Sequence, residues 1–97
     1  MKMMNAAHPG EILQSEFIEP YGLSSGRVAK ALSLPRTRIE RLVKEETGMT
    51  TDTAVRLAKF FRTSPMFWMN LQTQFDLAKT ECEIDVSSIP RYEGAAA

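Results

Sequence analysis

The sequence is poor in the residues that form cross-links and metal sites: it has one cysteine, Cys82, and one histidine, His8, among 97 residues. A single cysteine excludes a disulfide within the chain and gives no sign of an oxidising compartment. One histidine and one cysteine are too few for a metal site built from these ligands. The sequence also lacks a glycine-rich loop of the kind that binds nucleotide phosphates. We therefore expect no metal and no cofactor.

A catalytic constellation is missing as well. Cys82 and His8 are the residue types of a thiol–imidazole pair, but no third residue is placed by the sequence to orient them. We therefore expect a protein that is not an enzyme and has no small-molecule substrate.

Long apolar runs are absent, and the N-terminus does not show the pattern of a signal peptide. The composition, with 43% hydrophobic and 25% charged residues, is that of a globular protein and not of a disordered one. Ninety-seven residues suffice for one domain with a modest core. We expect a cytoplasmic protein of one domain that does not contact a membrane.

The charge that is present is distributed unevenly. Residues 24–44 hold six basic side chains and one acid, Glu40, and therefore carry +5 in a chain of net charge zero. Residues 1–23 carry −2, residues 45–63 carry 0, and residues 64–97 carry −3. A neutral protein with one basic segment is suited to binding nucleic acid there and other partners elsewhere.

Helical periodicity accounts for most of the chain. Apolar residues recur at helical spacing, and Pro9, Ser24 and Ser64-Pro65 mark helix starts. Four of the predicted helices span about residues 9–20, 25–32, 35–44 and 65–79. The fourth in chain order starts after Thr50 or Thr51, both suitable caps, and buries Ala54, Leu57, Ala58 and Phe61. The sequence thus predicts an all-α fold of five helices with a flexible N-terminus (residues 1–7), a DNA-binding domain (residues 8–80) and a partly disordered tail (residues 81–97).

The tail has a different pattern from the helices. Glu83-Ile84-Asp85-Val86 alternates polar and apolar residues, which predicts a short extended segment. Pro90 and the small residues 94–97 indicate a loose end.

The second and third predicted helices are joined by Ser33-Leu34 and together form a helix-turn-helix. Such a unit places its second helix in the major groove of DNA. In the third helix Ile39, Leu42 and Val43 face inward, so the basic residues face outward. The alternative is a solvated basic face that never meets DNA.

The outward face of the third helix offers side chains that read bases. Arg36 and Arg41 can each donate two hydrogen bonds to a guanine. Thr37 can offer its methyl group to thymine, or its hydroxyl to a base or phosphate. Glu40 can accept from a cytosine amine or pair at i,i+4 with Arg36 or Lys44.

Three further basic residues are better placed for the phosphate backbone. Arg27, Arg38 and Lys44 flank the base-reading positions, and phosphate contacts of this kind fix the register without reading sequence.

Several blocks of the sequence resemble the HigA/VapI-type antitoxins of the lambda-repressor-like helix-turn-helix family. The resemblance covers about residues 8–77. The blocks are His8-Pro9-Gly10-Glu11-Ile12-Leu13, Val28-Ala29-Lys30-Ala31-Leu32, Leu34-Pro35-Arg36-Thr37-Arg38-Ile39, Gly48-Met49-Thr50, Asp52-Thr53-Ala54-Val55-Arg56-Leu57-Ala58 and Ser64-Pro65-Met66-Phe67-Trp68-Met69-Asn70-Leu71-Gln72.

The resemblance implies a five-helix lambda-repressor-like fold and a homodimer that binds a palindromic operator of its own operon. It also implies a partner, a RelE-like toxin that cleaves mRNA and that the antitoxin neutralises. The alternative is a repressor of the same fold without a toxin. Two positions depart from the family: Glu45-Glu46-Thr47 replaces a basic stretch after the third helix, and Pro35 stands where the broader class often has Ser or Thr.

Two protein interfaces are expected. The fifth helix and tail should form the dimer, with Trp68, Ile84 and Val86 in the contact, and Trp68 or its neighbours should be partly buried only when two chains meet. An RNA-cleaving toxin must hold phosphates and is therefore expected to be basic, so acidic surfaces should receive it. The favoured surface is Glu11, Glu16 and Glu19 on the first helix; the alternatives are the acids of the tail or no partner at all.

Overall fold

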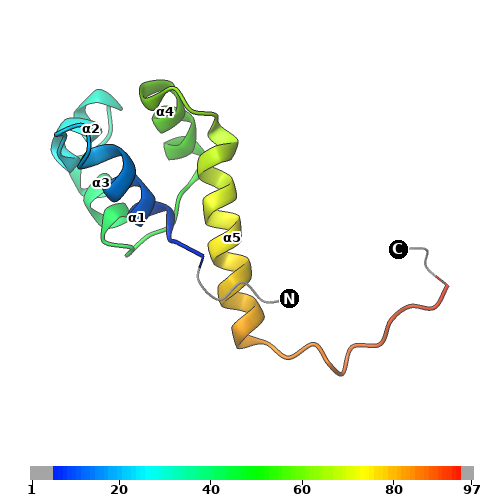
Figure 1. Cartoon of the computed structure of the whole chain (residues 1–97). Helices are drawn as coiled ribbons and strands as arrows, with labels where there is room; N and C mark the ends of the chain where they lie inside the picture. Colours follow the sequence, from blue (N-terminus) through cyan, green and yellow to red (C-terminus); the bar gives the residue numbers. More distant parts are fainter. Residues whose placement is uncertain (1–5, 95–97) are drawn as a thin grey trace.

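The computed structural model describes residues 6–94, and this part of the chain is helical without a strand (Figure 1). The predictions for residues 1–5 and 95–97 lie outside the described residues. The elements are α1 (Pro9–Ile12), the π-helical η1 (Leu13–Ile18), α2 (Ser25–Ala31), α3 (Arg36–Val43), α4 (Thr51–Phe61) and α5 (Pro65–Glu83). Since η1 continues α1 without a break, the two together form the first predicted helix. The predicted all-α helix-turn-helix fold is confirmed.

Side-chain caps begin most of the helices at the residues that the sequence marks. Ser24 Oγ accepts from the amide of Arg27 at 3.1 Å, and Ser64 Oγ accepts from the amide of Phe67 at 3.0 Å. Thr50 caps α4 in the same way. Each cap satisfies an amide that has no partner within its helix, which fixes where the helix begins. Helix α3 differs, because Pro35 precedes it and offers no side-chain cap.

The start of α1 explains the His-Pro-Gly block. His8 is buried and its Nδ1 accepts from the amide of Gly10 at 2.9 Å, while Pro9 occupies the first helical turn. A Cβ atom on Gly10 would lie only 1.8 Å from the carbonyl oxygen of Leu42 in α3. Only glycine therefore allows α1 to pack this closely against α3.

The apolar stripes of all helices meet in one core. Trp68 is fully buried within a single chain, and its Nε1 donates to Thr63 Oγ1 at 2.8 Å. For Trp68 itself, the expectation of burial only in a dimer is therefore wrong, because its ring already packs within one chain, with its centroid 4.9 Å from that of the Phe17 ring in η1. The core contains Leu13, Ile18, Val28, Ala29, Leu32, Ile39, Leu42, Met49, Ala54, Leu57, Ala58 and Trp68.

Helix α5 is longer than predicted. It runs to Glu83, across the boundary expected after residue 80, and its C-terminal end projects beyond the other helices (Figure 1). Glu83 is helical and not extended, which corrects the prediction for the start of the tail. Ile84 has extended backbone angles, but Asp85 and Val86 lead into a turn and not into a strand. Within residues 6–94, no helix has the length and apolarity needed to cross a membrane.

Candidate nucleic-acid interface

Helices α2 and α3 form the helix-turn-helix, and Ser33-Leu34 forms its turn as predicted. The amide of Leu34 donates to the carbonyl of Ala29 at 2.9 Å, and Ser33 adopts a left-handed conformation with φ 59°. In α3, Ile39 and Leu42 are buried against the core. This anchoring turns the opposite face of α3 toward solvent.

The outward face of α3 carries the predicted DNA-binding residues. Arg36, Thr37, Arg38 and Arg41 are exposed, as is Lys44 directly after the helix. Thr37 and Arg41 are four residues apart, and Arg38, Arg41 and Lys44 follow at intervals of three, so a surface that approaches α3 from solvent meets these side chains together.

Arg36 is held in place within its own helix. Its Nε donates to Glu40 Oε2 at 2.9 Å, so the predicted i,i+4 pair exists with Arg36 as the partner. A Cβ atom on Gly26 of α2 would lie 3.5 Å from Arg36 Nε, which shows that the arginine passes over Gly26. The Arg36 side chain remains 73% exposed, so its other guanidinium nitrogens are accessible to a ligand.

Arg38 has a partner that the sequence did not predict. Its Nη1 lies 2.8 Å from Asp52 Oδ2 in the first turn of α4. The other oxygen of Asp52 lies 3.2 Å from Arg56 Nε, and Arg56 Nη1 donates to the carbonyl of Leu32 at 2.7 Å. The hydrogen bond from Arg56 lowers the pKa of Asp52 below its ordinary value of 3.8, and the pairing with Arg38 lowers it further. These contacts connect α2, α3 and α4.

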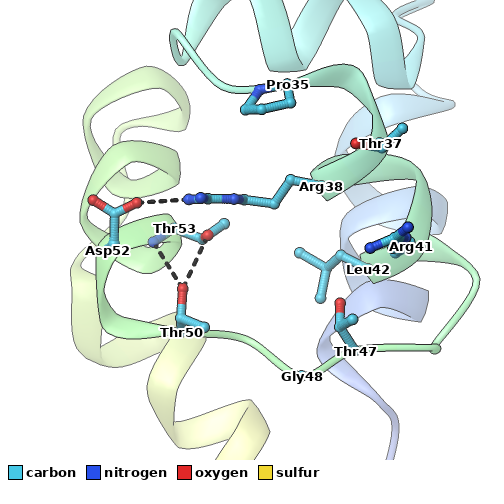
Figure 2. A pocket seen from close by; sticks show the side chains of 10 residues that line it. All are labelled: Pro35, Thr37, Arg38, Arg41, Leu42, Thr47, Gly48, Thr50, Asp52 and Thr53. Carbon is cyan, nitrogen blue, oxygen red and sulfur yellow. Dashed lines mark hydrogen bonds and ion pairs between the residues drawn. The ribbon is translucent and has the colours of Figure 1, made fainter.

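A hollow of about 620 Å³ opens between α3 and the N-terminal end of α4 (Figure 2). Figure 2 shows Arg38 crossing the hollow toward Asp52, with Thr37 and Arg41 on the α3 side. Thr50, the cap of α4, lies at its edge. Guanidinium and hydroxyl donors and a helix N-terminus suit an anionic ligand, whereas Asp52 opposes one.

The loop from α3 to α4 begins with acids and is tied to α5. Glu45 and Glu46 are exposed, and Glu45 has φ 62°, a left-handed conformation that residues other than Gly, Asn and Asp rarely adopt. Farther along, the amide of Met49 donates to Gln72 Oε1 at 2.5 Å. A Cβ atom on Gly48 would come within 2.9 Å of the same oxygen. Gln72 therefore sets the path of the loop, a role that sequence reasoning missed.

The remaining predicted residues lie apart from α3 along the chain. Arg27 is exposed in the first turn of α2. Ile84 and Val86 are 52% and 55% exposed in the tail. The acids predicted for toxin binding are all exposed on α1 and η1 or just after them: they are Glu11, Glu16 and Glu19.

Known proteins resemble the whole of this helical body, although no model of a protein family matches the chain. Virulence-associated protein I of Dichelobacter nodosus is 46% identical over 78 residues, which are 80% of this chain and 72% of that protein. The chain is 38% identical to the antitoxin HigA of Pseudomonas aeruginosa, solved with the higBA promoter. That match has a TM-score of 0.79 and covers 81% of this chain and 86% of the HigA chain.

A second solved structure is the antitoxin GraA in complex with its operator. It is 36% identical, with a TM-score of 0.85 over 95% of this chain and 96% of the GraA chain. The matched part of this chain includes the helix-turn-helix described above. On this fold and these identities, the chain belongs to the HigA/VapI-type antitoxin family of helix-turn-helix regulators.

Proposed function

We propose that this protein is a dimeric repressor that binds a palindromic operator of its own operon and neutralises a RelE-like toxin. One observation carries the DNA-binding part: the side of α3 that faces solvent concentrates arginines on a chain of zero net charge. The operator and promoter complexes of GraA and HigA support the same role. The proposal includes no enzymatic activity.

Base readout is assigned to the residues of α3. Arg41 and Thr37 reach bases in the major groove, and Arg36 reaches a guanine while Glu40 steadies its side chain. Arg27 and Lys44 bind the flanking phosphates. Arg38 is paired with Asp52, so it can bind a phosphate only if this ion pair opens.

The dimer is assigned to the exposed part of α5 and the tail. Leu77 is 51% exposed on α5, and Ile84 and Val86 are exposed beyond it. A second chain that covers these side chains removes apolar surface from water and places two recognition helices on half-sites about one helical turn apart, ~34 Å. Trp68 is left out of this interface, because its ring is buried in each chain.

The toxin surface is assigned to the exposed acids Glu11, Glu16 and Glu19. They lie on α1 and η1 or just after them, outside the helix-turn-helix, so one molecule has room for DNA and toxin on different helices. Reversing the three charges together should abolish neutralisation of the toxin encoded beside this gene and leave operator binding intact. If no neighbouring gene encodes a toxin, the alternative of a stand-alone repressor holds.

The DNA-binding proposal is tested with duplexes selected from a random library and with scrambled versions of the winners. Arg41→Ala should weaken binding to the selected duplex by ~1–3 kcal/mol, the worth of one bidentate base contact, and should affect scrambled DNA less. The matched control is Lys79→Ala, which removes the same charge from an exposed position on α5. Equal losses for Arg41→Ala on both duplexes would mean that Arg41 contacts only phosphate.

A further inference from the structure

Asp52 occupies an unusual place for an acid, since it lines the hollow beside the basic face of α3. It is more than half exposed, and each of its carboxylate oxygens is bonded to a different arginine. Arg56 comes from the same helix and also donates to the carbonyl of Leu32. Arg38 comes from the recognition helix, so its pair with Asp52 spans from α3 to α4 (Figure 2).

The two arginines differ in what holds them. Arg56 has two acceptors, Asp52 and the Leu32 carbonyl, and its i,i+4 spacing from Asp52 favours pairing within α4. The side chain of Arg38 is 45% exposed and reaches across the hollow to the carboxylate. A loss of the Asp52 charge therefore changes the surroundings of Arg38 most.

The pair of Arg38 and Asp52 has no net charge. A DNA phosphate that approaches the hollow meets both members, so the attraction to the guanidinium is offset by the repulsion from the carboxylate. The pKa of Asp52 is ordinarily 3.8 and its arginine partners lower it further, so the carboxylate is charged at neutral pH. At neutral pH, Asp52 therefore repels a phosphate that Arg38 attracts.

We propose that Asp52 is a specificity-determining residue: it withholds Arg38 from the phosphate backbone and thereby lowers the affinity for DNA that lacks the operator. The inference rests on the proposed DNA binding and deepens it. A phosphate contact adds affinity for every sequence, so a residue that suppresses one reduces binding to the many competing sites. The bases that Arg41 and Thr37 read are unaffected by this suppression.

The decisive variant is Asp52→Asn, which keeps the shape of the side chain and one carbonyl oxygen for Arg56. It should bind scrambled duplex more tightly than the wild type does. The slope of log K against log salt should become steeper by ~0.9, the value of one added phosphate contact, so the gain should shrink ~3.5-fold between 50 and 200 mM salt. Glu93→Gln is the control, since it makes the same change in net charge at an exposed position of the tail, away from α3.

Arg38→Gln identifies the side chain responsible. In the wild-type background it should leave the salt slope for scrambled duplex unchanged, because Arg38 makes no phosphate contact there. In the Asp52→Asn background, Arg38→Gln should return the affinity for scrambled duplex to the wild-type value. Exposed ion pairs contribute little to stability, so both variants should fold, and thermal unfolding checks this. If Asp52→Asn does not fold, Arg38→Gln alone decides.

Two results would overturn the inference. One is an Asp52→Asn protein that binds scrambled duplex no better than Glu93→Gln does. The other is a slope that falls by ~0.9 when Arg38→Gln is made in the wild type, because Arg38 then already contacts phosphate. Wild-type protein that binds no DNA at all would instead remove the proposed function, and the inference with it.

Discussion

The contact between Gly10 and Leu42 gives the sharpest prediction for stability, because it places backbone against backbone. A Cβ atom at residue 10 would lie 1.8 Å from the Leu42 carbonyl oxygen and 2.7 Å from its carbon. Neither atom belongs to a flexible side chain, so Gly10→Ala can be accommodated only if α1 moves away from α3. Leu42 lies in α3, and the displacement therefore reaches the face that is proposed to bind DNA.

The magnitude follows from two opposing effects. Overpacking a core costs about 1–3 kcal/mol, and this contact belongs at the upper end of that range. Alanine in place of glycine in a helix recovers up to about 1 kcal/mol. Gly10→Ala should therefore destabilise the protein by about 2 kcal/mol, which corresponds to a Tm lower by roughly 8–16 °C for a domain of this size.

Thermal unfolding by circular dichroism measures the effect, and Gly26→Ala is the matched control. A Cβ atom on Gly26 meets Arg36 at an ordinary contact distance of 3.5 Å, so this variant should be as stable as the wild type or more so, by up to about 1 kcal/mol. If Gly10→Ala unfolds at the temperature of Gly26→Ala, the close approach of α1 to α3 does not exist in solution.

Three further predictions concern single side chains. Trp68→Phe loses the hydrogen bond to Thr63 and should lower the free energy of unfolding, measured in urea, by about 1–2 kcal/mol. The sedimentation coefficient should stay unchanged, because Trp68 is buried within one chain. Glu45→Gly relieves the left-handed backbone and should stabilise by about 1 kcal/mol, whereas Glu46→Gly should not. Pairing with the two arginines lowers the pKa of Asp52 in the folded protein below its ordinary value of 3.8. The ionised carboxylate therefore stabilises the fold fully above pH 3.8, and this stabilisation is lost as the pH falls through the pKa of the folded state. The stability difference between wild type and Asp52→Asn should therefore shrink in acid.

Local signals in the sequence were sufficient for the helices and for the turn. Ser24 and Ser64 cap helices that begin where they predict, and of the two candidates for α4 it is Thr50 that forms the cap, because a cap depends only on residues three positions away. The end of α5 was predicted too early, since the apolar stripe fades after Lys79 while the backbone continues to Glu83 without a helix breaker.

Contacts between distant residues were the part that the sequence did not reveal. Periodicity placed Trp68 on an apolar face, but the same period serves a core or a subunit contact, and the residue proved to be core. Outward position suggested that Arg38 meets phosphate, yet its carboxylate partner lies 14 residues away. Gln72 reaches a backbone amide 23 residues away. No local pattern marks either partner.

Helix α3 is held by the buried side chains of Ile39 and Leu42 and by backbone contacts in and beside it, and this has a consequence for how the family can change its operators. Gly10 packs on the carbonyl of Leu42, Gln72 binds the amide of Met49, and Arg56 binds the carbonyl of Leu32. None of these contacts uses the side chains of Thr37 or Arg41. Substitutions at these two exposed positions should therefore alter the DNA sequence that is bound while the free energy of unfolding changes by less than about 0.5 kcal/mol.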